Sequence, residues 1–97
     1  MVIVHDIFVC KPGNASKVAK LFKEVMSGSS EVVNIMTDMT GQYNRVIMVS
    51  KYESLTEYEK FMEGYKNPTE EQKQKFAKMQ GYTEMYLTGS REIYQTW

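Results

Sequence analysis

The stretch VIVHDIFVC, residues 2–10, carries apolar side chains on both of its alternating faces. One face has Val2, Val4 and Phe8, and the other has Ile3, Ile7 and Val9. A run of this kind is typical of a strand that is buried on both sides. Pro12, which cannot donate a hydrogen bond to a neighbouring strand, ends the run. The fold must therefore cover both faces of the sheet that holds this strand.

Three further segments have the composition of strands. Residues 31–40 and 43–52 are separated by a short turn around Gly41, which predicts an antiparallel hairpin. A last strand is expected over 83–97, with a bulge or kink at Gly89.

Three segments have the periodicity of amphipathic helices, over 15–26, 55–66 and 69–79. Asn14 is the expected N-cap of the first, which Gly28 closes. Ser54 and Glu57 have the spacing of a capping box for the second. The third has its N-cap at Asn67 or Thr69, and its apolar stripe consists mainly of Phe76 and Met79, so it should be the least firmly docked.

The element order β-α-β-β-α-(α)-β predicts one domain over residues 1–97, because a chain of this length cannot support two cores. The order is that of the α+β, ferredoxin-like split βαβ fold, with a four-stranded antiparallel sheet. Right-handed crossovers place both main helices on one face of the sheet.

The opposite face of this sheet is then uncovered although it is apolar. Its side chains are Ile3, Ile7, Val9, Ile47 and Val49. Soluble monomers rarely expose a patch of several hundred Å². We therefore expect a two-fold homodimer through the open sheet face. Burial of about 600 Å² of apolar area gives a gross term near 15 kcal/mol, enough to offset the cost of association.

Composition narrows the class of protein. Twelve Lys plus Arg balance 12 Asp plus Glu, so a nucleic-acid partner is not expected. No apolar run approaches the roughly 20 residues that span a bilayer, and no signal peptide is recognisable. One cysteine, Cys10, excludes an internal disulfide and suits the cytoplasm. One His and one Cys cannot build a zinc site, so a metal is not expected. No other cofactor is expected either.

Three local features carry a family resemblance: Lys11-Pro12-Gly13 at the end of the first strand, residues 52–55 (Tyr-Glu-Ser-Leu) between strand and helix, and residues 89–94 (Gly-Ser-Arg-Glu-Ile-Tyr) near the end. With the element order, they make the chain resemble the dimeric α+β barrel superfamily, which includes antibiotic-biosynthesis monooxygenase-like and NIPSNAP-like proteins. The resemblance implies a ligand pocket in each protomer, between sheet and helices.

Haem-degrading members of that superfamily use a strand Asn, a strand Trp and an iron-ligating His on a helix. The resemblance places Asp6 at the Asn position and Tyr52 at the Trp position. The single histidine, His5, lies on a predicted strand instead of a helix. Haem binding or degradation is therefore the third of the functions considered.

Asp6 is the candidate catalytic base. It shares the pocket face with Val4, Phe8 and Cys10, where a desolvated carboxylate could take a proton from an acidic phenol or enol. The alternative is a structural Asp6 paired with Arg91, Lys51 or a tyrosine hydroxyl.

Tyr52 is the candidate group that orients the substrate. The predicted substrate-binding residues are Phe8, Met48, Ser50, Tyr58 and Met62. Tyrosines and methionines suit flat, partly polar ligands, but they also fill small cores. His5 points to the opposite face, where it is either a hydrogen-bonded interface residue or a base or pH-sensitive group. Cys10 is expected to be a small buried apolar residue.

Two functions from different classes follow. The first is a cofactor-independent monooxygenase that acts on a small aromatic or polyketide-like substrate, with the third helix as a lid. The second is a non-catalytic ligand-binding or assembly module of NIPSNAP-like type.

Overall fold

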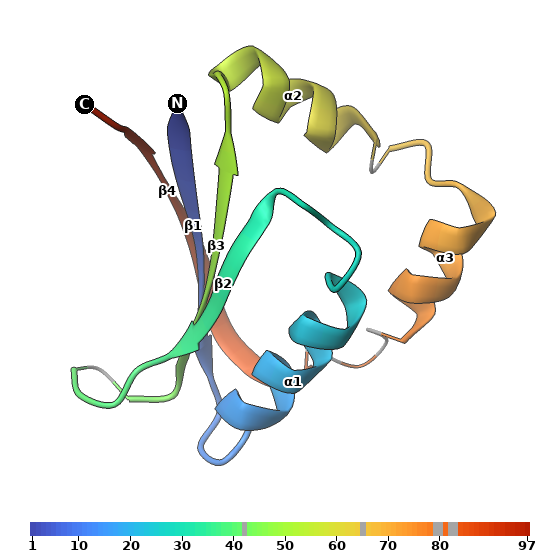
Figure 1. Cartoon of the computed structure of the whole chain (residues 1–97). Coiled ribbons are helices and arrows are strands. Elements are labelled where there is room, and N and C mark those ends of the chain that lie inside the picture. The colour runs from blue at the N-terminus through green and yellow to red at the C-terminus, as the bar shows by residue number, and fades with distance from the viewer. Residues whose placement is uncertain (42, 65, 79–80, 82–83) are drawn as a thin grey trace.

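A four-stranded antiparallel sheet carries its helices on one face (Figure 1). The structure is a computed structural model that describes residues 1–41, 43–64, 66–78, 81 and 84–97, without the side chains of residues 75 and 76. The elements in chain order are β1 (Val2–Cys10), α1 (Ala15–Val25), β2 (Val32–Thr37), β3 (Arg45–Tyr52), α2 (Leu55–Gly64), α3 (Glu70–Ala77) and β4 (Tyr86–Gln95).

The strands follow the order β2-β3-β1-β4, and every neighbouring pair is antiparallel. This topology confirms the ferredoxin-like α+β fold. The central strand β1 places Asp6 opposite Met48 of β3 and opposite Arg91 of β4. Because directly paired residues point to the same side of a sheet, these three side chains share the face that carries the helices, here called the inner face.

The inner face holds two separate apolar clusters. Under α1, the buried residues are Cys10, Val18, Phe22 and Val46. Under α2, they are Val2, Val4 and Tyr52. Phe8 belongs to the first cluster, where its ring meets Phe22 edge-on at 5.0 Å between centroids. Each helix thus covers its own end of the sheet, because each brings its own apolar stripe.

The helix starts follow the capping patterns in part. The Glu57 amide donates to Ser54 Oγ at 3.3 Å, which is one half of the expected capping box of α2, whereas the Glu57 carboxylate accepts from Lys60. Thr69 is the N-cap of α3, because its Oγ1 accepts from the Gln72 amide and its own amide donates to Gln72 Oε1. Asn14 precedes α1, but its side chain makes no capping hydrogen bond and only its carbonyl accepts, from Val18.

The predicted hairpin strands were too long. We expected 31–40 and 43–52, but β2 ends at Thr37 and β3 begins at Arg45. The reason is Asp38, whose Oδ1 accepts a hydrogen bond from the Arg45 amide and so closes the hairpin before Gly41.

The predicted helices were also too long at their ends. The first was predicted over 15–26 but ends at Val25, and Met26 is the C-cap, whose amide donates to the Phe22 carbonyl. The second ends at Gly64 and the third spans Glu70–Ala77, so Met79 of the predicted stripe lies outside the described residues.

The expected bulge at Gly89 was wrong. Gly89 pairs regularly with Phe8, and the register shifts between Val9 and Cys10, which face Thr88 and Tyr86. The extra residue, Leu87, allows β4 to start beside Cys10, and the Lys11 amide then bonds to the Met85 carbonyl. The predicted start at Thr83 lies outside the described residues.

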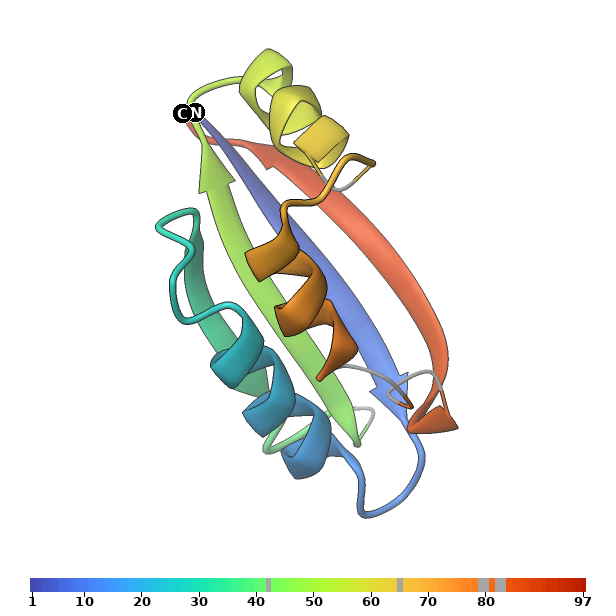
Figure 2. The same cartoon turned by 90° about the vertical axis from the view of Figure 1, so that its right-hand side faces the viewer.

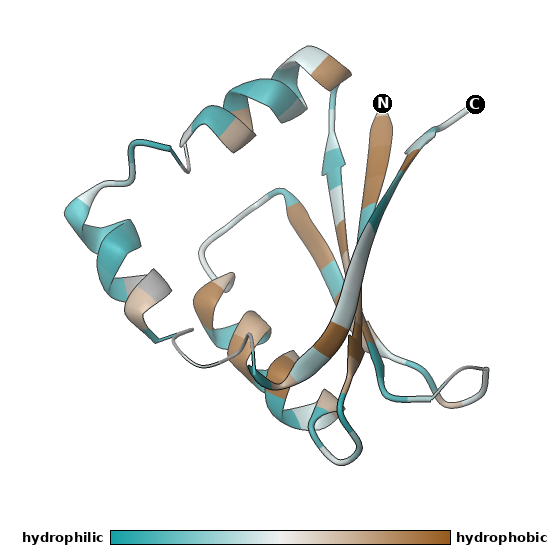
Figure 3. Ribbon diagram, turned by 180° about the vertical axis from the view of Figure 1, so that it is seen from behind, coloured by the Kyte–Doolittle hydropathy of each residue, from teal (hydrophilic) through white to brown (hydrophobic). Residues whose placement is uncertain are grey.

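The outer face of the sheet has no helix over it in Figure 1. Hydrophobic stretches run along β1 and the neighbouring strands (Figure 3). Ile3, Ile7, Ile47 and Val49 are only partly buried there, and Met36 is 40% exposed. His5 lies among them, edge-on to Tyr94 at 5.2 Å. The apolar outer face expected from the sequence is therefore present.

Candidate functional site

Three aromatic side chains meet where α2 crosses the end of β3, and we call them the α2 aromatic cluster: Tyr52, Tyr58 and Phe61. The ring centroid of Tyr52 lies 5.1 Å from that of Tyr58 and 5.3 Å from that of Phe61. Tyr52 is fixed by β3, whereas the other two lie three residues apart on one face of α2. The cluster has apolar walls and two phenol groups, which suits a flat ligand with polar substituents.

Asp6 and Arg91 form an ion pair beside this cluster. Arg91 donates from Nε to Asp6 Oδ1 at 2.5 Å, across the register that pairs β1 with β4. The Asp6 side chain is 13% exposed, whereas that of Arg91 is 46% exposed. The pairing with Arg91 is one of the three pairings that the structural alternative for Asp6 considered.

Tyr58 links the ion pair to the aromatic cluster. The Arg91 guanidinium lies 5.9 Å from the centroid of the Tyr58 ring, within the range of a cation–π contact. The hydrogen bond to Asp6 is the main cause that raises the pKa of Arg91 above its ordinary value. The pairing therefore favours the charged form of a side chain that is already protonated at neutral pH.

The Tyr58 hydroxyl is buried and has no hydrogen-bond partner among the described residues. Burial is the main cause that raises the pKa of Tyr58, so the hydroxyl keeps its proton at neutral pH. A buried hydroxyl without a partner costs about 1–3 kcal/mol. A ligand that supplies an acceptor here would recover part of this free energy.

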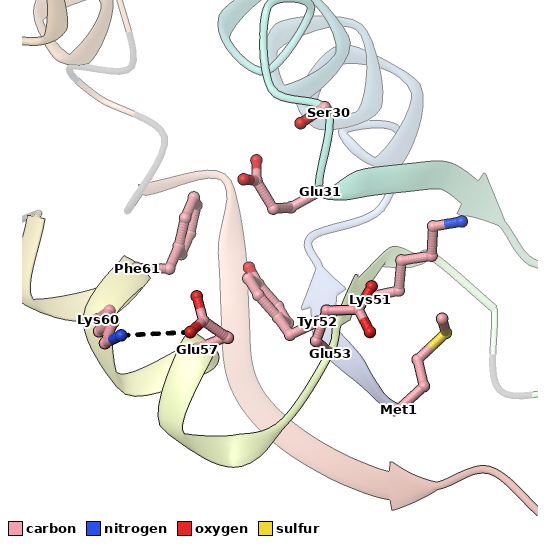
Figure 4. Close-up of a pocket in the computed structure, with 9 residues that line it drawn as sticks. All are labelled: Met1, Ser30, Glu31, Lys51, Tyr52, Glu53, Glu57, Lys60 and Phe61. Carbon is pink, nitrogen blue, oxygen red and sulfur yellow. Dashed lines mark hydrogen bonds and ion pairs between the residues drawn. The ribbon is translucent and has the colours of Figure 1, made fainter.

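A pocket of about 470 Å³ opens on the other side of the aromatic cluster, between the start of α2, the end of β3 and the segment before β2. It is lined by Met1, Ser30, Glu31, Lys51, Tyr52, Glu53, Glu57, Lys60 and Phe61. In Figure 4 the hydroxyl end of Tyr52 lies between Phe61 and Glu31. Lys60 is paired with Glu57 at 3.3 Å. The volume is that of a small-molecule site.

The structure brings some of the predicted site residues together. Tyr52 and Tyr58 are in contact, and Met48 lies beside Asp6 on the inner face. Ser50 is buried on the same face, between Val4 and Val32 in the sheet register.

Two other predicted site residues, Phe8 and Met62, are not in contact with the α2 aromatic cluster in the interactions described above. Phe8 belongs to the cluster under α1 and contacts Tyr86 at 5.3 Å. Met62 is half-buried on α2. Of all the predicted site residues, Tyr52 is the one that lines the pocket of Figure 4.

Sequence reasoning missed two residues as site residues. Arg91 was considered only as a partner of Asp6, and Phe61 only as part of an apolar stripe. Neither carries a local motif. Their position depends on the β1–β4 register and on where α2 crosses β3, which involve residues far apart in the chain.

The remaining chemistry-bearing residues do not enter this site. Cys10 is buried, and burial raises the pKa of its thiol, which disfavours a nucleophilic thiolate. His5 lies on the outer face, away from the cluster. In the part of the chain that the structure describes, no group of His, Cys, Asp and Glu side chains is arranged to hold a metal ion. Among these same residues, no helix is both long and apolar enough to cross a bilayer.

No family model matches the chain, and no curated protein matches it in sequence. Solved structures match it by fold. A NIPSNAP domain protein from Burkholderia xenovorans has a TM-score of 0.82 at 11% identity, covering 100% of this chain and 95% of that one. A NIPSNAP family protein from Agrobacterium tumefaciens has a TM-score of 0.78 at 13% identity, covering 97% and 90%.

An antibiotic biosynthesis monooxygenase is also similar, with a TM-score of 0.61 at 10% identity and coverage of 100% and 99%. Identities this low establish the likeness of fold and carry no activity with them. The chain therefore has the small α+β fold that NIPSNAP-family proteins share with antibiotic biosynthesis monooxygenases.

Proposed function

We propose that this protein is a homodimer that binds a small, flat, partly polar molecule against the α2 aromatic cluster. The observation that carries the proposal is the Tyr58 hydroxyl, which is buried beside the Asp6–Arg91 ion pair and has no hydrogen-bond partner in the part of the chain that the structure describes. Native structures seldom leave such a group unsatisfied, and a bound ligand is one way to satisfy it. The neighbouring rings offer the flat apolar surface that an aromatic ligand needs.

The dimer in this proposal uses the outer face of the sheet. Ile7 and Ile47 pair with each other at its centre, and Met36 continues the apolar surface on β2. Charged side chains occupy the borders of this region, at Arg45 and Lys51. An apolar centre with a charged border is the usual composition of a homodimer interface.

The second candidate function is a cofactor-independent monooxygenase acting on a small aromatic or polyketide-like substrate. The buried carboxylate of Asp6 next to the Tyr58 ring favours it, as does the fold of the monooxygenase structure reported above. In this function Asp6 takes a proton from a phenol or enol, while Tyr52 and Ser50 orient the substrate and α3 covers it. Asp6 must first release, or share, its hydrogen bond from Arg91.

The binding test measures by protein NMR the affinity of wild type and of Tyr58→Phe for a panel of hydroxylated naphthalenes. Loss of one hydrogen bond should weaken binding roughly three- to tenfold. Tyr43→Phe is the matched control, because Tyr43 is exposed in the β2–β3 hairpin. Equal affinity of the Tyr58→Phe variant, or chemical-shift changes confined to residues away from α2 and β4, contradicts the proposal.

The activity test incubates the same compounds with the protein under air and follows oxygen consumption. Asp6→Asn should abolish turnover while the thermal midpoint changes little. Glu24→Gln, an exposed position on α1 that is away from both the aromatic cluster and the outer face, should leave turnover unchanged. Unchanged turnover in Asp6→Asn rejects Asp6 as the base. Binding without any turnover in wild type favours the non-catalytic ligand-binding module.

A further inference from the structure

We infer that the ligand of this site is an aromatic molecule bearing a planar anionic group, such as a carboxylate, and that Arg91 is the residue that selects it. This inference rests on the proposed function and narrows its ligand class. The polar group of the ligand is then recognised by Arg91 of the edge strand β4, and not by Asp6, the candidate base.

The Arg91 guanidinium is oriented by Asp6, but only one of its nitrogen atoms donates a hydrogen bond among the described residues. Its Nε donates to Asp6, and no hydrogen bond to either of its Nη groups is seen within the described residues. Asp6 is the more buried of the two partners, and nearly half of the Arg91 side chain is open to solvent. A guanidinium has a planar arrangement of donors that matches the two oxygens of a carboxylate. Because Asp6 already orients it, less entropy is lost when a ligand binds.

The surroundings of Arg91 suit the aromatic part of such a ligand. Ile93 follows on the same face of β4, paired with Val4, and is 44% exposed although it is apolar. The Tyr58 ring lies under the guanidinium on the side of α2. Figure 2 shows no helix in front of the middle of β4, and the Arg91 and Ile93 side chains are both partly open to solvent there.

The charges near Arg91 favour an anion over a cation. On the inner face its described charged partner is Asp6, which is buried behind it and already hydrogen-bonded. The pocket of Figure 4 lies across the aromatic cluster, and its lining holds three glutamates against two lysines, one of which is already paired with a glutamate. A carboxylate is therefore expected on the Arg91 side of the cluster and not in that pocket.

The test compares 2-naphthoate with 2-naphthamide, which have the same ring and nearly the same shape but differ in charge. Wild-type protein should bind the carboxylate at least roughly tenfold more tightly at pH 7 and low salt, measured by calorimetry. Arg91→Gln should reduce this ratio to near one, while the affinity for the amide stays within about twofold. Arg91→Lys, which keeps the charge but not the planar fork, should give an intermediate ratio.

Lys60→Gln is the control for the pocket of Figure 4, because it removes a cation from the lining on the other side of the cluster. This variant should keep the wild-type ratio of the affinities for 2-naphthoate and 2-naphthamide. If Lys60→Gln abolishes the preference for the carboxylate and Arg91→Gln does not, the assignment to Arg91 is overturned. Equal wild-type affinities for the two ligands overturn the anion selectivity but leave the proposed function standing. Absence of binding by both compounds, and by the hydroxylated panel, counts against the proposed function itself.

Discussion

The Asp38 carboxylate closes the β2–β3 hairpin by accepting two hydrogen bonds from Arg45. Asp38 accepts the Arg45 amide at 3.1 Å through Oδ1 and Arg45 Nε at 3.0 Å through Oδ2. Between them, Tyr43 and Asn44 both have positive φ angles, of 66° and 58°. Asn tolerates this left-handed region, whereas a bulky Tyr rarely adopts it. The two hydrogen bonds to one carboxylate stabilise the turn against this strain.

The hairpin pair predicts how stability depends on pH. The hydrogen bond from Arg45 is the main cause that lowers the pKa of Asp38. A lowered folded-state pKa stabilises the protein above the unfolded value of about 3.9, and this contribution is lost as the pH falls through the folded-state pKa. Asp38→Asn should therefore reduce stability at pH 7 and flatten its decline between about pH 5 and pH 2, measured by urea unfolding.

Glu57→Gln serves as the comparison for that experiment, because Glu57 is exposed and pairs only with the exposed Lys60 on its own helix. Its pH profile should follow that of wild type. An Asp38→Asn profile as steep as wild type would show that the pair does not contribute through the charge of Asp38.

Among the secondary-structure elements, α2 matters most for the site, because it carries two of the three rings of the aromatic cluster. It is a short helix whose residues are at most half-buried. Short helices with little buried surface depend strongly on their ends. The cap from Ser54 to the Glu57 amide is therefore important for holding Tyr58 and Phe61 over β3.

Removal of this cap should loosen α2. Ser54→Ala is expected to cost about 1 kcal/mol of stability, seen as a lower urea midpoint and as faster amide exchange within α2. Thr56→Ala, two residues further on and also exposed, should be neutral or slightly stabilising because Ala favours helix. If the two variants unfold at the same urea concentration, the capping bond has no measurable role.

The whole molecule is a flat plate, with principal extents of 37 × 36 × 19 Å. Helices cover one side of the sheet, and the apolar outer face lies open on the other (Figures 1 and 3). A plate with one uncovered apolar side gains stability by pairing two copies face to face, and such a contact is naturally two-fold symmetric. The dimer predicted from the sequence remains a prediction.

The central pair of the outer face provides the test. Ile47, which pairs with Ile7 and Met36, should not tolerate a charge in a dimer interface, so Ile47→Lys should sediment as a folded monomer at micromolar concentration. Thr56→Lys on the exposed side of α2 should remain dimeric, like wild type. Wild-type protein that sediments as a well-folded monomer at this concentration would contradict the dimer.

Much of the fold was predictable because it is encoded in local periodicity. An apolar run on both faces of the strand marked β1, and helical spacing marked α1 and α2, each within one segment of chain. The ends of elements were less predictable, because they depend on contacts at a distance. The early end of β2 at Thr37 follows from one hydrogen bond between Asp38 and Arg45, seven residues apart.

The identity of the polar residue on the inner face of β1 was visible in the sequence, since Asp6 interrupts an apolar strand. The sequence left its partner open among Arg91, Lys51 and a tyrosine, and it did not show the environment of the carboxylate. Only the antiparallel register of β1 with β4 pairs Asp6 with Arg91, 85 residues later, and only the crossing of α2 leaves the Tyr58 hydroxyl buried beside them. Periodicity acts between near neighbours and therefore fixes which elements form, whereas strand register and helix docking depend on the packing of the whole chain and fix which side chains meet.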